Sequence, residues 1–230
     1  MTKQHAHRRI RSFVRREGRL TSGQERALVE LGPRLLLDLQ GGFLDLTDIF
    51  GRTAPVTLEI GFGNGESLAT QAQTHPERDY IGIEVHRPGV GHLLQVAERL
   101  ALTNLRAFNA DAVEVLERCI ADGSLAVIQI FFPDPWHKKR HHKRRLIQPE
   151  FVTLLVRKLA PGGRIHLATD WEDYAEHMRE VMEAAPELTN LHGPGTFAPS
   201  PTDRPPTKFE QRGKRLGHGV WELIYRRVQE

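Results

Sequence analysis

The sequence predicts an α/β fold in which helices cover both faces of a doubly wound, mostly parallel sheet. Apolar runs of strand length alternate along the chain with amphipathic stretches of helical periodicity. This alternation is typical of βαβ units. Glycines follow the first predicted strand, and acidic residues follow later strands. Such residues belong at the carboxyl edge of the sheet, where ligands bind.

The elements follow in chain order from the apolar runs and the residues that interrupt them. Strands are predicted at residues 56–60, 80–85, 105–109, 125–132, 164–168 and 220–226. Helices are predicted at residues 66–73, 90–100, 112–121, 148–159 and 171–184. Pro161, Gly162 and Gly163 predict a helix stop and a turn. Residues 193–206, rich in proline, glycine, serine and threonine, predict a loop.

Length and composition indicate one soluble globular domain preceded by a short lead-in. The 230 residues suit a single sizeable core, and 39% are hydrophobic against 27% charged. We divide the chain into a basic arm with short helical elements, residues 1–54, and an α/β domain, residues 55–230. No apolar stretch has the length of a membrane span or of a secretory signal core. We therefore expect no membrane partner and a cytoplasmic location.

Cysteine usage points to the same compartment. Cys119 is the only cysteine, which excludes disulfide scaffolds and cysteine-based metal sites. Its helical surroundings predict a packed residue rather than a nucleophile. The histidines of residues 137–142 stand among cations that would repel a metal ion, so we expect no metal site.

Positive charge is concentrated in two segments although the net charge is only +3. The first nineteen residues carry seven Lys or Arg and one acid, whereas residues 137–145 carry six Lys or Arg, three His and no acid. Clustered cations attract phosphates, because each neutralised phosphate releases counterions. A solvated charge run is the alternative, but two blocks of one sign flank the predicted site.

The glycine-rich segment after the first strand predicts a cofactor site. Gly61, Gly63 and Gly65 stand at positions i, i+2 and i+4. Without a Cβ, the chain can turn tightly and a ligand can approach closely; a tight βα turn alone is the alternative. A dinucleotide fingerprint has glycine at i+5, where this chain has Glu66. Together with Glu59, this acid would repel pyrophosphate but suits a cationic sulfonium.

Two further acids follow the second and third strands. Glu84 ends the second strand, where a carboxylate can accept hydrogen bonds from ribose hydroxyls. Asp111 follows the third strand, where a carboxylate can accept from the adenine amine. Taken alone, Asp111 is better explained as a helix N-cap. Its order after the glycines and Glu84 favours a role in ligand binding.

The fourth strand leads into an unusual segment, FFPDPWHKKRHHKRR. Prolines on both sides of Asp134 restrict the backbone and hold its carboxylate at the rim of the sheet. Trp136 offers a flat face for stacking or packing. A turn residue at Asp134 and a core residue at Trp136 are the alternatives. Asp170 ends the fifth strand on the same edge, where it could also cap the next helix.

These motifs resemble the class I methyltransferases that use S-adenosylmethionine, and in particular the bacterial tRNA (guanine-N7)-methyltransferase family. The similar segments are SFVRREGR, EIGFGNGE, IGIEVH, NADA, the segment around Asp134, TDW and TKFEQRG. The resemblance runs from about residue 11 to the C-terminus. It implies a Rossmann-like methyltransferase fold, with a seven-stranded sheet and an antiparallel strand near the C-terminus.

The resemblance also implies roles for individual residues. Residues expected at the cofactor are Glu59, Gly61, Gly63, Gly65, Glu84, Asp111 and Asp134. Residues expected at the substrate are Lys138, Asp170, Thr207, Lys208, Phe209 and Glu210. Residues expected at the RNA are Arg140, His141, His142, Lys143, Arg144 and Arg145. Asp134 is the expected catalytic residue, which orients the guanine and stabilises its developing positive charge.

The expected reaction is methyl transfer from S-adenosylmethionine to N7 of a guanine in tRNA, and the resemblance points to position 46 in the variable loop. Three other classes of protein are weighed against this expectation. A nicotinamide-dependent oxidoreductase is disfavoured by the glycine spacing and the basic run. A non-catalytic RNA-binding module would leave the ordered acids unexplained. A methyltransferase acting on protein, DNA or another RNA remains open, because fold alone does not determine substrate. Nothing in the sequence points to an obligate protein partner.

Overall fold

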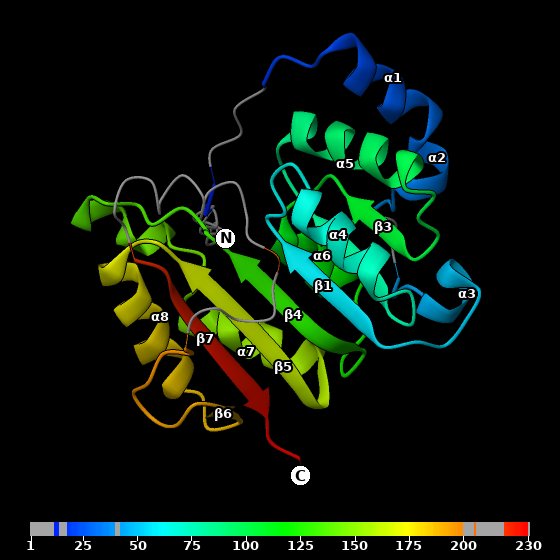
Figure 1. Ribbon diagram of the computed structural model, residues 1–230. Helices are drawn as coiled ribbons and strands as arrows, with labels where there is room; N and C mark the ends of the chain where they lie inside the picture. Colours follow the sequence, from blue (N-terminus) through cyan, green and yellow to red (C-terminus); the bar gives the residue numbers. More distant parts are fainter. Residues whose placement is uncertain (1–11, 14–17, 40–41, 200–204, 206–218, 230) are drawn as a thin grey trace, which may run out of the picture.

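A seven-stranded sheet forms the centre of the protein in a computed structural model (Figure 1), which describes residues 12–13, 18–39, 42–199, 205 and 219–229. The strands are β1 (Val56–Ile60), β2 (Asp79–Ile83), β3 (Leu105–Phe108), β4 (Leu125–Phe131), β5 (Leu159–Thr169), β6 (Leu188–Asn190) and β7 (Trp221–Arg227). Their order is β3-β2-β1-β4-β5-β7-β6. Strands β1 to β5 pair in parallel, whereas β7 pairs antiparallel with β5 and β6. The predicted fold class is confirmed.

Some helices precede the first strand, and the others alternate with the strands. They are α1 (Ser22–Glu30), α2 (Gly32–Leu35), α3 (Leu46–Phe50), α4 (Glu66–Thr74), α5 (Arg87–Arg99), α6 (Ala112–Arg118), α7 (Pro149–Lys158), α8 (Glu172–Glu183) and the 3₁₀ helix η1 (Lys139–Arg144). In the part of the chain that the structure describes, no helix combines the length and the apolarity that a membrane crossing requires.

Helices cover both faces of the sheet (Figure 1), and two apolar cores, one on each face, hold these layers together. Helices α4 and α5 pack on one face through residues such as Leu68 and Leu93. Helices α6, α7 and α8 pack on the other face, against Leu58 and Ile128 among others. Because central parallel strands are covered on both faces, all five residues of β1 are buried.

The segment before β1 packs against the α/β domain. Helix α1 begins with a capping box, in which the Thr21 hydroxyl accepts from the Gln24 amide and the Gln24 side chain accepts from the Thr21 amide. Helix α1 then packs against α5. Further along, the Leu44 amide donates to the Cys119 carbonyl over 2.8 Å. The side chain of Cys119 is buried, as expected for a small packed residue.

The structure differs from the sequence prediction around β5 and β6. Helix α7 ends at Lys158 and β5 begins directly at Leu159, so the predicted turn at residues 161–163 lies within the strand. The pairing with β4 shifts between Leu159 and Arg164, which shows that these residues form an irregularity of the ladder. Strand β6 was not predicted among the individual elements, because three residues are too few for a recognisable alternation.

The topology places the candidate site. The order of strands reverses between β1 and β4, so the connections from these two neighbours run in opposite directions. In open α/β sheets, ligands bind in the crevice that forms outside the carboxyl ends of such strands. The residues after β1, β2, β3, β4 and β5 all lie along this edge.

Candidate functional site

The glycine loop between β1 and α4 makes the tight turn that the sequence predicts. Gly61, Gly63 and Gly65 have φ angles of 77°, 62° and 76°. This left-handed region is costly for residues with a side chain, so glycine is required here. At Gly65, a Cβ would also approach the side chain of Leu93 to 2.6 Å. The loop is therefore adapted to its conformation and to the close approach of α5.

Sequence analysis did not identify Gly89 as part of this site. This residue lies in the first turn of α5, and a Cβ built on it would come within 2.0 Å of the Gly63 carbonyl oxygen. The start of α5 thus lies directly against the glycine loop. The sequence contains a weak signal for this contact, a glycine within the first turn of a helix, but it does not identify the partner.

Glu84 links three of the loops at the carboxyl edge. Its Oε2 accepts a hydrogen bond from the Gly63 amide at 2.9 Å. Its Oε1 accepts from the amides of Val85 and His86 at 2.7 and 2.8 Å. The Asn109 side chain donates to the backbone carbonyl of Glu84 at 2.9 Å. The carboxylate is therefore held in one orientation next to the glycine loop by charge-assisted hydrogen bonds.

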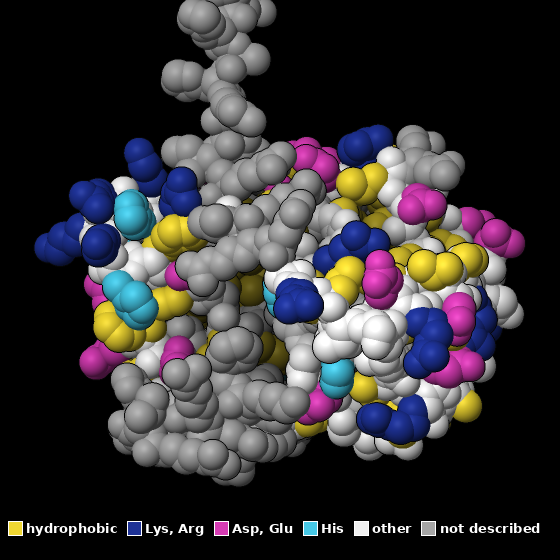
Figure 2. Space-filling view, turned by 90° about the horizontal axis from the view of Figure 1, so that it is seen from above, with side chains coloured by type: hydrophobic (Ala, Val, Ile, Leu, Met, Phe, Trp, Pro, Cys, Tyr) yellow, Lys and Arg dark blue, Asp and Glu magenta, His cyan; other side chains and the backbone are white. Residues whose placement is uncertain are grey.

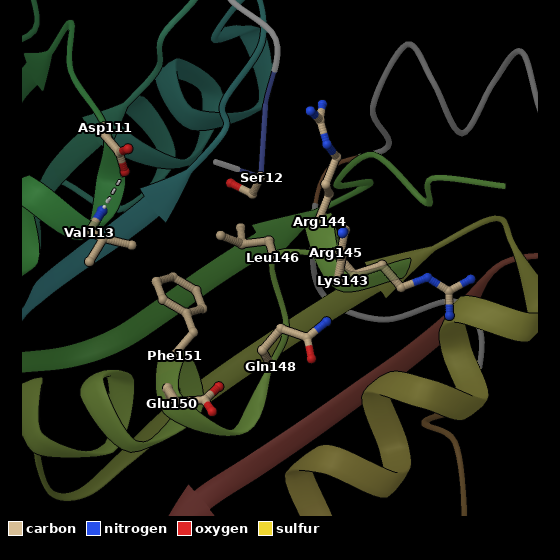
Figure 3. Close-up of a pocket in the computed structure, with 10 residues that line it drawn as sticks. All are labelled: Ser12, Asp111, Val113, Lys143, Arg144, Arg145, Leu146, Gln148, Glu150 and Phe151. Atoms are coloured by element: carbon tan, nitrogen blue, oxygen red, sulfur yellow. Dashed lines mark hydrogen bonds between the residues drawn. The ribbon is translucent and has the colours of Figure 1, made fainter. Parts of the chain in front are cut away.

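Asp111 and Glu59 occupy different positions relative to the sheet, one after β3 and the other within β1. Asp111 is the N-cap of α6, and its Oδ1 accepts from the Val113 amide at 3.0 Å. The capping role is therefore present, and it is compatible with a ligand contact. Asp111 also lines a cavity of about 280 Å³ with Ser12, Leu146 and other residues (Figure 3). Glu59 is buried within β1, in register with its neighbours in β2 and β4.

Asp134 lies on a strained turn directly after β4. The backbone amide of Trp136 donates to Asp134 Oδ1 at 2.9 Å, and the Asp134 side chain is exposed. Phe132 and Trp136, on either side, have φ angles of 51° and 49°. Such conformations are uncommon for bulky residues and are concentrated at functional sites. The Phe132 amide donates to the Ala168 carbonyl at 2.8 Å, which anchors the turn to β5.

The basic segment forms η1 and presents cations to solvent. Lys138, Lys139, Arg140 and Lys143 are exposed, whereas His141, His142 and Arg144 are half-buried. Figure 2 shows Lys and Arg side chains gathered on one side of the carboxyl edge. Desolvation, followed by repulsion from neighbouring cations such as Arg140 and Arg144, lowers the pKa of His141. A neutral His141 is consistent with the Arg140 side chain donating to its Nε2 at 3.3 Å.

Arg145 differs from its neighbours, and its predicted contact with RNA requires correction. Its side chain is only 2% exposed and points toward α8 (Figure 3). The guanidinium donates to the Pro135 carbonyl at 3.0 Å, pairs with Asp173 and lies over the Tyr174 ring. The hydrogen bond from Arg145 lowers the pKa of Asp173. Arg145 therefore holds the segment after β4 against α8. We do not include Arg145 among the residues expected to contact RNA.

Asp170 follows β5 on the same edge, half-buried. Its alternative role as a helix cap is not what the structure shows, because Trp171 occupies the N-cap position of α8. The Trp171 ring lies edge-on to the His137 ring, with 4.2 Å between centroids. This contact joins the basic segment to α8 near Asp170. The predicted substrate residues Thr207, Lys208, Phe209 and Glu210 lie outside the described residues.

The fold is that of a Rossmann-like methyltransferase, and comparison with solved structures agrees on this architecture. A 16S rRNA methyltransferase, KamB, aligns with a TM-score of 0.59 at 15% identity, covering 81% of this chain and 94% of that chain. A 30S ribosomal A1408 methyltransferase from an uncultured bacterium aligns with a TM-score of 0.53 at 14% identity, covering 84% and 95%. At these identities the likeness shows the architecture alone.

Similarity in sequence is more specific. A family model described as "Putative methyltransferase" matches residues 53–223. The tRNA (guanine-N(7)-)-methyltransferase of Pseudoalteromonas atlantica is 60% identical over 221 residues, covering 96% of this chain and 92% of the relative. The protein of that name from Alkalilimnicola ehrlichii is 64% identical over 222 residues, covering 96% and 93%. The chain belongs to the tRNA (guanine-N(7)-)-methyltransferase family.

Proposed function

We propose that this chain transfers a methyl group from S-adenosylmethionine to N7 of a guanine in tRNA, at position 46 of the variable loop. The observation that supports this proposal most is the arrangement at the carboxyl edge. There a glycine loop, Glu84, Asp111 and Asp134 lie next to a row of exposed cations. A tRNA substrate would place the reaction in the bacterial cytoplasm.

The residues along β1, β2 and β3 fit S-adenosylmethionine. Gly61, Gly63 and Gly65 have no side chain that could block a ligand, and Glu66 makes the start of α4 unfavourable for a phosphate. Glu84 would accept from the ribose hydroxyls, and Asp111 from the adenine amine. When bound, S-adenosylmethionine supplies an electrophilic methyl group on a cationic sulfur. The neighbouring carboxylates favour binding of that cation.

The basic segment fits the phosphate backbone of RNA. Lys139, Arg140 and Lys143 are exposed on η1, directly after the turn that carries Asp134. Each phosphate that these cations neutralise contributes binding free energy that depends on salt concentration. Such contacts position an RNA without reading its sequence. Lys138 stands directly before η1 and Asp170 directly after β5, and we place the guanine near these two residues.

The chemistry requires little proton transfer from the protein. N7 of guanine is an acceptor with a lone pair on the major-groove edge and has no proton to lose. A general base is therefore not needed. The purine ring becomes positively charged as the reaction proceeds, and the Asp134 carboxylate would stabilise this charge. Holding the guanine in line for attack supplies much of the remaining acceleration.

The proposed function is tested by incubating the protein with bulk tRNA and S-adenosylmethionine that carries a labelled methyl group. After digestion, we expect the label in 7-methylguanosine, derived from position 46. Label in another nucleoside would overturn the assignment, as would labelling of ribosomal RNA or protein in preference to tRNA.

The role of Asp134 is tested by Asp134→Asn, which removes the charge and keeps the shape. We expect kcat to fall by about 100-fold or more, the range observed when a transition-state stabilising group is removed. Asp48→Asn is the matched control, because Asp48 is an exposed acid on α3, away from the carboxyl edge. Wild-type turnover in Asp134→Asn would refute the electrostatic role.

A further inference from the structure

Trp136 makes contacts within its own turn, with Ser12 of the N-terminal arm and with η1. Its backbone amide donates to Asp134 Oδ1 at 2.9 Å. Its indole Nε1 donates to the carbonyl oxygen of Ser12, in the N-terminal arm, at 3.0 Å. The Arg144 guanidinium lies 4.8 Å from the centre of its ring, and the His141 ring stands edge-on to it at 5.8 Å.

These contacts correspond neither to a core residue nor to an open stacking platform. Trp136 is half-buried, and Arg144 lies against its ring as a cation–π partner. Its φ angle of 49° is strained, and strain of this kind persists only where surrounding contacts impose it. The contacts of the side chain are therefore what holds the backbone of Trp136, and hence the amide that orients Asp134.

We propose that Trp136 is a positioning residue, which holds Asp134 in its reactive orientation and couples it to the N-terminal arm and to Arg144. This inference rests on the proposed methyl transfer and deepens it. In this proposal the side chain of Trp136 makes no contact with the reacting atoms, and Trp136 acts on Asp134 indirectly. It acts through its own backbone amide, which engages one oxygen of Asp134 and orients the other toward the site.

The same arrangement connects RNA binding with catalysis. Arg144 is half-buried on η1 among exposed cations. A phosphate that binds its guanidinium would therefore change the contact between Arg144 and the Trp136 ring. Ser12 belongs to the segment with the other cluster of positive charge, and its carbonyl is fixed by the indole of Trp136. RNA bound at either basic segment therefore acts on contacts that hold the turn carrying Asp134.

Two substitutions test the side-chain contacts of Trp136. Trp136→Leu removes the aromatic ring and the indole N–H together, whereas Trp136→Phe keeps a ring for Arg144 and removes only the donor to Ser12. Trp221→Phe makes the same change from indole to phenyl on β7 and serves as the control. Each variant is compared with wild-type protein that has been shown to form 7-methylguanosine, which keeps failure of this proposal distinct from failure of the proposed function.

For Trp136→Leu we expect kcat to fall by about 10- to 100-fold, as when a catalytic group is misplaced by about 1 Å. The affinity for S-adenosylmethionine, measured by calorimetry, should stay within about twofold of wild type. Adding Asp134→Asn to this variant should cause no further loss beyond Asp134→Asn alone, because both changes act on the same carboxylate. Wild-type kcat in Trp136→Leu, or fully additive losses, would overturn the proposal.

If Trp136→Leu does not fold, Trp136→Phe provides a second test of the proposal. Because the ring is retained and only the donor to Ser12 is lost, kcat should fall less than in Trp136→Leu, and the KM for tRNA should rise several-fold. A KM for tRNA equal to that of wild type and of Trp221→Phe would contradict the coupling to the arm.

Discussion

The contact between Gly89 and the glycine loop leads to a sharp prediction about cofactor binding. In Gly89→Ala, the new Cβ would lie 2.0 Å from the Gly63 carbonyl oxygen and 3.0 Å from its carbon. An ordinary carbon–oxygen contact is about 3.3 Å long, so the start of α5 and the loop must separate by more than about 1 Å. Both groups are backbone, and neither can move by rotating a side chain.

The displaced loop is the one that Glu84 holds through the Gly63 amide. We expect the dissociation constant of S-adenosylmethionine to rise by about 10- to 100-fold, in line with the cost of misplacing binding groups by about 1 Å. Overpacking alone should destabilise the fold by about 1–3 kcal/mol, offset in part by the better helix propensity of alanine, about 1 kcal/mol.

Gly91→Ala is the matched control, two residues further along α5. It has the same gain in helix propensity, but its Cβ meets Gln24 of α1 at 2.9 Å instead of the glycine loop. Calorimetric titration with S-adenosylmethionine should show weakened binding only for Gly89→Ala, while thermal unfolding reports the stability of both variants. Wild-type affinity in a folded Gly89→Ala protein would refute the argument that this contact sets the position of the loop.

Two further predictions concern the segment after β4. Replacing Lys139, Arg140 and Lys143 together by glutamine should weaken tRNA binding, and each lost phosphate contact should lower the slope of log K against log salt concentration by about one; an unchanged slope would exclude this surface. The pKa of Asp173 is lower in the folded protein than in the unfolded chain, because Asp173 pairs with Arg145. The pair therefore stabilises the fold at pH values above the ordinary aspartate pKa. This stabilisation is lost as the pH falls through the folded-state pKa. The stabilities of Asp173→Asn and wild type should therefore begin to converge as the pH falls below about 4 and should meet only below the folded-state pKa of Asp173. A difference that stays constant at lower pH would contradict this linkage.

A site residue could be placed from the sequence where a local pattern, such as the end of a strand or a glycine turn, determines where that residue lies. Alternating apolar runs place strands, and the residue after a parallel strand lies at the carboxyl edge of the sheet. Asp111 after β3 and Asp134 after β4 therefore lie where the sequence predicts. The glycine loop is predictable for the same reason, because left-handed backbone requires glycine.

Local patterns in the chain specify most of the strands and helices, the edge of the sheet at which ligands bind and the residue types at that edge. Which neighbours those residues contact depends on the folded arrangement. Arg145 stands among five other Lys and Arg residues in residues 137–145, yet it alone turns inward to Asp173 and Tyr174. Trp136 meets Ser12 across a separation of 124 residues. The physical reason is that charge and periodicity are local properties of a chain, whereas burial and hydrogen bonding depend on segments that only folding brings together.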